Sequence, residues 1–225
     1  MIVELSADLG EGSPGEDEIW PLIQRANVAC GGHIGDAASM REAADNARKY
    51  NVILGAHPSY PDRENFGRES MAMDPAALRD AIIAQIAALE AIAPVHHVKP
   101  HGALYNDAHR DVVLARVIVD AIEGRALVAP AHSQMATAAR EAGTPFIAEA
   151  FADRRYEPDG SLTPRSIAGS TLTIEEAAAQ AALLAREHVV IARDGSRISV
   201  HFDTLCIHAD MPGAAERLRA IVRAI

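Results

Sequence analysis

The segment VHHVKPHGALYN, residues 95–106, shows the pattern that decides the fold class. A short apolar run at 95–99 ends in Lys99, and His101 and Asn106 follow soon after it. Short runs of this kind, bounded by glycine, proline or polar residues, indicate β-strands. A lysine at the end of a buried strand is costly unless an anion or a hydrogen-bond partner accompanies it. The segment therefore predicts a strand that carries polar groups into a functional site, and a structural ion pair of Lys99 is the alternative.

The same pattern recurs along the chain. Further strand candidates lie at 2–7, 26–30, 52–56, 126–129, 146–150 and 204–208. Helical stretches are expected at 36–50, 75–92, 110–122, 133–142, 174–187 and 214–225. Strands that alternate with helices build a parallel sheet. The exception is 189–200, where Asp194-Gly195 stands between two apolar runs and predicts an added β-hairpin.

Polar groups at the end of nearly every strand candidate favour a closed barrel over an open sheet. These groups are Asp8 and Glu11, Asn27 and His33, His57, Lys99 and His101, His132, Glu149 and Asp153, and His208 and Asp210. Barrel enzymes gather catalytic groups from the ends of several strands, whereas open sheets bind ligands mainly at one switch point. We therefore predict one α/β domain over residues 1–225, a seven-stranded TIM-like (β/α) barrel with an added hairpin.

The composition predicts a folded, acidic, cytoplasmic protein. The chain has 225 residues, of which 49% are hydrophobic and 23% charged, enough for one buried core. A net charge of −10 without a basic cluster argues against nucleic-acid and anionic-membrane partners. No apolar run approaches the roughly 20 residues that span a bilayer, and the start lacks a signal-peptide pattern. Cys30 and Cys206 form no CxxC motif, which fits a reducing compartment.

Two sets of residues are candidates for chemistry. The catalytic candidates are Asp8, Glu11, His57, Lys99, His101, Glu149, Asp153 and His208. The candidates for binding substrate or phosphate are Asn27, His33, Asp36, Arg68, Asn106, Arg154, Arg165 and Asp210. Carboxylates and imidazoles act as general acids and bases, and arginine forks match carboxylates and phosphates. Structural roles are the alternative, above all for Asp36, which stands where it would cap a helix.

A metal site is a further open alternative. Asp8, His33, His57 and His101 could supply ligands, but no HExxH motif or tight spacing demands a metal. The sequence also lacks the GxxxxGK[ST] loop, so any nucleotide binding is not of the Walker type. It has no GxSxG nucleophile elbow either. The motifs alone thus predict a barrel hydrolase or lyase with a His/Asp/Glu/Lys site.

Seven segments, taken together and in order, resemble the family of 5-oxoprolinase A subunits, also called the LamB/YcsF family. They are DLGEG from Asp8, NVACGGHIGD from Asn27, GAHPSYPD from Gly55, FGR from Phe66, KPHGALYN from Lys99, EAFADRRY from Glu149 and CIHAD from Cys206. The resemblance implies a barrel of the glycoside hydrolase/deacetylase type. It also implies ATP-dependent opening of the lactam of 5-oxoproline to glutamate, together with two further subunits, with ATP and Mg²⁺ bound by the complex.

Two other functions stay open beside this one. The first is a metal-dependent deacetylase or amide hydrolase of the same barrel group. Stoichiometric zinc or manganese in the protein, together with amide cleavage that needs no ATP, would favour this function. The second is a non-catalytic subunit whose polar groups capture a small acid for a partner enzyme. A homo-oligomer is also compatible with the sequence.

Overall fold

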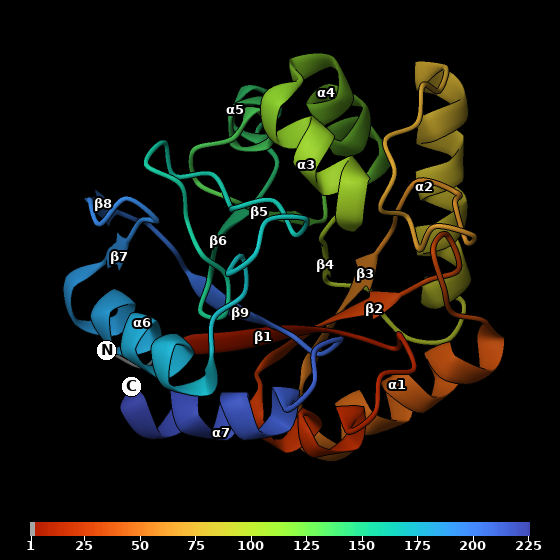
Figure 1. Cartoon of the computed structure of the whole chain (residues 1–225). Coiled ribbons are helices and arrows are strands. Elements are labelled where there is room, and N and C mark those ends of the chain that lie inside the picture. The colour runs from red at the N-terminus through yellow and green to blue at the C-terminus, as the bar shows by residue number, and fades with distance from the viewer. Residues whose placement is uncertain (1–2) are drawn as a thin grey trace.

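A closed parallel barrel forms the centre of the computed structural model, which describes residues 3–225 (Figure 1). Within these residues its order is β1-β2-β3-β4-β5-β6-β9, and β9 pairs with both β6 and β1 to close it. The strands are β1 Glu4–Leu9, β2 Arg25–Ala29, β3 Ile53–His57, β4 His97–Val98, β5 Ala126–Ala129, β6 Phe146–Phe151 and β9 Thr204–His208. The predicted seven-stranded barrel is confirmed. Residue 2 of the first predicted strand lies outside the described residues.

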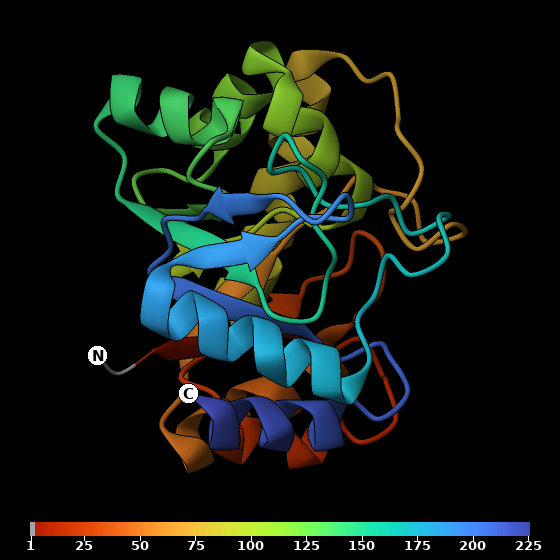
Figure 2. The same ribbon diagram turned by 60° about the vertical axis from the view of Figure 1, so that its left-hand side comes forward.

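Helices surround the barrel (Figures 1 and 2). They are α1 Ala37–Tyr50, α2 Pro75–Glu90, α3 Gly102–Arg110, α4 Val112–Ala121, α5 Gln134–Ala142, α6 Ile174–Glu187 and α7 Ala214–Ala224, with short 3₁₀ turns η1 Glu16–Glu18 and η2 Trp20–Leu22. Their starts follow the sequence: Asp74 caps α2 ahead of Pro75, and Thr173 forms a capping box with Glu176 on α6. None of the described helices is long and apolar enough to cross a membrane.

The predicted hairpin is also confirmed. Strands β7 Val189–Ile191 and β8 Arg197–Ser199 pair antiparallel, outside the barrel. Figure 2 shows the hairpin beside α6, which itself packs along α7. Ala192, between the two strands, forms a bridge with Tyr156 in the segment after β6, and residues 198–201 line a cavity.

The structure differs from the sequence expectation around β4. This strand covers two residues instead of the predicted five, and Pro100, which has no N–H to continue the ladder, limits it on the carboxyl side. The chain then turns into α3, where the sequence predicts no helix before residue 110. Helix α3 buries Leu104, Tyr105 and Ala108, so its apolar spacing is that of a packed helix.

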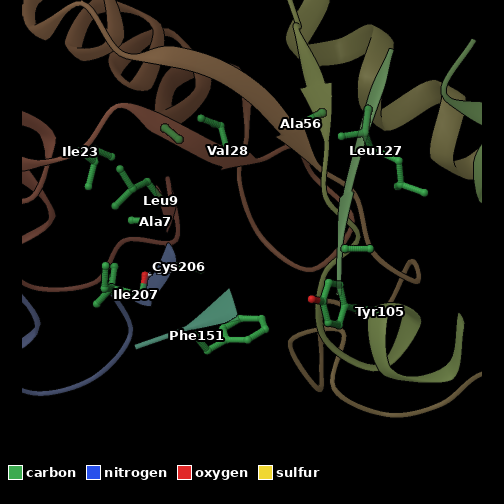
Figure 3. Packing of buried hydrophobic residues seen from close by; sticks show 14 of the residues in the cluster. Ala7, Leu9, Ile23, Val28, Ala56, Tyr105, Leu127, Phe151, Cys206 and Ile207 are labelled. Atoms are coloured by element: carbon green, nitrogen blue, oxygen red, sulfur yellow. Dashed lines mark hydrogen bonds between the residues drawn. The ribbon is translucent and has the colours of Figure 1, made fainter. Parts of the chain in front are cut away.

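The strands face two different environments. Alternate residues such as Leu5, Ala7 and Leu9 of β1 pack against the helices, and Figure 3 shows Ala7 and Leu9 within this apolar layer. The intervening residues face the barrel interior, where Asp8 contacts Asn27 and Lys99. The fold therefore places a polar interior inside an apolar shell, and the polar groups meet at the carboxyl ends of the strands.

Candidate active site

A cavity of about 810 Å³ opens at the carboxyl ends of the strands. Twelve of the predicted site residues line it: Asp8, Glu11, His57, Arg68, Lys99, His101, Asn106, Glu149, Arg154, Arg165, His208 and Asp210. Asn27, His33 and Asp153 are buried directly behind these residues and contact them. The loops after β3 and β6, together with residues that follow β8, form the walls.

Lys99 is the centre of the site. Its Nζ lies 2.9 Å from Asp8 Oδ1 and 2.9 Å from Glu149 Oε1, and 3.1 Å from the sulfur of Cys206. The contact with Glu149 is an ion pair without hydrogen-bond alignment. Burial opposes the charge of the lysine, but the carboxylates outweigh it and hold the pKa of Lys99 well above its usual value. Lys99 is therefore a buried ammonium between two carboxylates.

A chain of polar side chains inside the barrel orients Asp8. Asn27 Nδ2 donates to Asp8 Oδ1 at 2.8 Å, and Asn27 Oδ1 accepts from His97 Nε2 at 2.9 Å. His97 Nδ1 in turn accepts from Arg25 at 3.1 Å, and Arg25 pairs with Glu4 at 2.7 Å. Burial and the neighbouring guanidinium lower the pKa of His97, which keeps the ring neutral in this role. Asn27 is thus a residue that positions Asp8.

Two backbone carbonyls fix the histidines next to Asp8. His57 Nδ1 donates to the carbonyl of Lys99 at 2.7 Å, and His101 Nε2 donates to the carbonyl of Phe66 at 3.0 Å. The opposite nitrogens, His57 Nε2 and His101 Nδ1, face each other at 3.0 Å. Both rings therefore present their second nitrogen to the same small volume.

Glu11 completes this cluster. Its Oε1 lies 3.1 Å from His33 Nε2 and 3.4 Å from His101 Nδ1. Burial raises the pKa of the Glu11 carboxyl to about 7 and lowers the pKa of His33 to about 2, while that of His101 falls well below its usual value. For His57, the carboxylate of Asp8 outweighs burial and raises the pKa.

Asp153 and His208 form a separate pair at the ends of β6 and β9. His208 Nδ1 donates to Asp153 Oδ1 at 3.0 Å, and the backbone amide of His208 donates to Asp153 Oδ2 at 2.8 Å. The imidazole stacks on Phe151, with ring centroids 5.5 Å apart. Asp153 holds His208 in one orientation beside the cavity, so its own part is positioning.

Cationic groups stand at the mouth of the cavity. Asp210 Oδ2 accepts from Arg68 at 2.5 Å and from Arg165 at 3.0 Å. Arg154 lies deeper and donates to the carbonyls of Thr163 and Ser170. Arg68 and Arg165 thus share one acidic partner that an anionic ligand could replace.

The structure does not support the binding role predicted for Asp36. This residue is outside the cavity lining, and its carboxylate accepts from the amides of Ala38 and Ser39 as the N-cap of α1. Sequence reasoning missed Tyr105, which donates to Glu149 Oε2 at 2.9 Å, and Cys206 beside Lys99. Tyr105 lies within KPHGALYN, and Cys206 precedes His208 by two strand positions, so both signals were present in the sequence.

A closed parallel barrel with an acid, base and cation cluster at the carboxyl ends of its strands is the active-site arrangement of TIM-like barrel enzymes. The chain belongs to the LamB/YcsF family, whose model matches residues 3–225. This confirms the resemblance seen in the sequence.

Two proteins with similar sequences show which members of this family the chain resembles. The chain is 44% identical, over 236 aligned positions, to a protein from Chloroflexus aggregans that is named as the A subunit of 5-oxoprolinase. The match covers 98% of this chain and 94% of that protein. Among solved structures, the lactam utilization protein from Thermus thermophilus superposes with a TM-score of 0.92 and 43% identity, covering 100% of this chain and 96% of the other.

Proposed function

We propose that this chain is the subunit of an ATP-dependent 5-oxoprolinase in which the lactam ring of 5-oxoproline is opened to L-glutamate. The observation that carries the proposal is the ammonium of Lys99 between Asp8 and Glu149 on the wall of a cavity whose mouth holds Arg68 and Arg165. The relative from Chloroflexus aggregans, with its name of 5-oxoprolinase, supports the choice of substrate.

The cavity suits a small anion that carries an amide. 5-Oxoproline has one carboxylate and one lactam, and arginine forks bind carboxylates and phosphates with two parallel hydrogen bonds. Arg68 and Arg165 would take the carboxylate in place of Asp210, which leaves the lactam toward Lys99. A volume of about 810 Å³ also leaves room for a phosphoryl group on the lactam oxygen.

The chemistry needs a base, a cation and an acid. ATP would supply a phosphoryl group to the lactam oxygen, which activates the ring carbon toward water. Cleavage of the C–N bond then leaves an acyl phosphate, which a second water hydrolyses to glutamate and phosphate. Glu149, whose Oε1 takes part in no hydrogen bond, would accept the proton of the attacking water. Lys99 would stabilise the charge that develops on oxygen, and His208, oriented by Asp153, would protonate the ring nitrogen as the C–N bond breaks.

We propose that partner subunits bind most of the nucleotide. The described residues fit a phosphoryl group better than a whole nucleotide, because the chain has no GxxxxGK[ST] loop and Asp210 pairs with both Arg68 and Arg165. We place Mg²⁺ and the remainder of ATP with two further subunits. Cys30 and Cys206 are buried free thiols, which fits the reducing cytoplasm that we propose as the compartment.

We expect glutamate release from 5-oxoproline to require this chain, both partner subunits and ATP. The measurement compares the chain alone with the three-protein mixture, each with and without ATP, after every partner is shown to be folded. Release by this chain alone without ATP would contradict the proposal and favour a simple amide hydrolase.

Replacement of Arg165 by methionine should raise KM for 5-oxoproline by about 10–100-fold with a smaller effect on kcat, because a hydrogen bond to a charged group is worth about 1.5–3 kcal/mol. Steady-state kinetics of the complex provide the check. Arg116→Met is the matched control, since Arg116 pairs with Glu141 between two outer helices. An unchanged KM in Arg165→Met would remove this residue from substrate binding.

A further inference from the structure

Four acceptor atoms converge beside Lys99, at the ends of β1, β3 and β4. They are His57 Nε2, His101 Nδ1, Glu11 Oε1 and Asp8 Oδ2. His57 Nε2 lies 3.0 Å from His101 Nδ1, 3.4 Å from Asp8 Oδ2 and 4.0 Å from Glu11 Oε1, and His101 Nδ1 lies 3.4 Å from Glu11 Oε1. All four residues are at most 7% exposed, so bulk water screens these atoms poorly.

The backbone determines which nitrogens carry lone pairs. A neutral imidazole has one N–H, and His57 and His101 direct theirs to the carbonyls of Lys99 and Phe66. With both rings neutral, the remaining nitrogens are acceptors that face each other and two carboxylates. Acceptors held together in a buried site repel one another unless a cation lies between them. The cluster therefore requires either an extra proton or a metal ion.

The distances suit a metal ion. Zinc binds imidazole nitrogen and carboxylate oxygen at about 2.0–2.2 Å, so the ligand atoms of a tetrahedral site lie roughly 3.3–3.6 Å apart. The separations of 3.0–4.0 Å among His57, His101 and Glu11 bracket that value, and Asp8 joins them through His57 at 3.4 Å. The ring of His57 stands at 89° to that of His101, so one ion can lie in the plane of both rings. His33 stacks on His101 at 2°, and parallel rings exclude a shared ion, which makes His33 a supporting residue.

Surrounding groups hold the carboxylates in place. Asn27 donates to Asp8 Oδ1 at 2.8 Å, and Lys99 contacts both oxygens of Asp8. One lone pair of Asp8 Oδ2 then remains free to face His57. His33 Nε2 holds Glu11 Oε1 from the other side at 3.1 Å. Metal sites use supporting hydrogen bonds of this kind to orient their ligands.

We propose that Asp8, Glu11, His57 and His101 bind one divalent transition-metal ion of the Zn²⁺ type. Two imidazoles and two carboxylates favour zinc over magnesium or calcium, which prefer oxygen ligands. All four residues line the cavity, so the ion has a path from solvent and stands beside the proposed reaction centre. The proposed lactam chemistry does not depend on this ion.

The test measures metal binding directly. Tag-free protein, stripped with a chelator, is dialysed against Zn²⁺, and metal per chain is determined by mass spectrometry. We expect one Zn²⁺ per chain, and affinity at least about 100-fold weaker in His101→Gln and in Glu11→Gln, because even supporting residues cost 10–100-fold. The matched control is His208→Gln, another strand-end histidine, whose partner is Asp153 and which should bind Zn²⁺ normally.

A second measurement does not depend on the variants being folded. Co²⁺ added to the wild-type protein should give the intense visible absorption of a low-symmetry site, and Zn²⁺ should displace it. Wild-type protein that binds no stoichiometric Zn²⁺, or ligand variants that bind it as tightly as the wild type, would overturn the proposal. The cation in the cluster would then be a proton on His57. Since neither readout uses 5-oxoproline, failure of this proposal is distinguishable from failure of the proposed function.

Discussion

Methionine in place of Lys99 should reduce glutamate release at least about 100-fold and destabilise the barrel by about 3–5 kcal/mol. The stability loss follows because Asp8 and Glu149 keep their charges in a site where the lysine is 2% exposed. The loss of turnover follows because no other lysine or arginine among residues 3–225 pairs with either of these two carboxylates. Urea unfolding and glutamate assays of the reconstituted complex measure the two effects separately.

A second variant separates catalysis from folding. Lys99→Met combined with Glu149→Gln removes one of the two uncompensated charges, and the amide of the new side chain can still accept from Tyr105. Stability should therefore recover in part, while turnover should stay low. If the single variant kept turnover within about threefold of wild type, Lys99 would be a structural ion pair, as the sequence alone also allowed.

The barrel could be predicted from the sequence because each strand carries two signals. An apolar run indicates the strand, and the polar residue after it indicates that the carboxyl end faces a site, as in the run that ends at Lys99. The same logic placed Glu149 and His208 at one end of the fold, where the structure puts them beside one cavity. Helix α3 was missed because Lys99, Pro100 and Gly102 are typical of a loop, although Leu104 and Ala108 have helical spacing.

Individual roles could not be predicted in the same way. From the sequence, Asp36 could bind a ligand or cap a helix. Its hydrogen bonds to two backbone amides show that it caps the helix. The orientation of His101 depends on the carbonyl of Phe66, 35 residues away, and no local pattern encodes that contact. His97 lies in a strand, as predicted, but no sequence pattern indicated that its ring links Asn27 to Arg25 inside the barrel. Such roles depend on tertiary contacts between strands.

Alanine at Gly102 should destabilise the protein by about 2–5 kcal/mol and reduce turnover at least about tenfold. Gly102 has φ +56, where a side chain costs about 1–2 kcal/mol. An added Cβ would also lie 2.4 Å from the carbonyl oxygen of Gly67, a backbone atom that cannot swing aside as a side chain would. Overpacking of this kind costs typically about 1–3 kcal/mol. Unfolding curves and glutamate assays measure the two effects.

The effect on turnover follows from what the clash displaces. Gly67 O accepts from Ala103 N at 2.9 Å, and the adjacent Phe66 carbonyl holds His101 Nε2, so moving this loop releases the imidazole. Gly124→Ala is the matched control, with φ +81 and, apart from its chain neighbours, no atom of the described residues within 4 Å of the added carbon. It should cost only the backbone strain of about 1–2 kcal/mol and leave turnover intact. Equal losses of stability and turnover in the two variants would mean that the 66–67 loop does not set the position of His101.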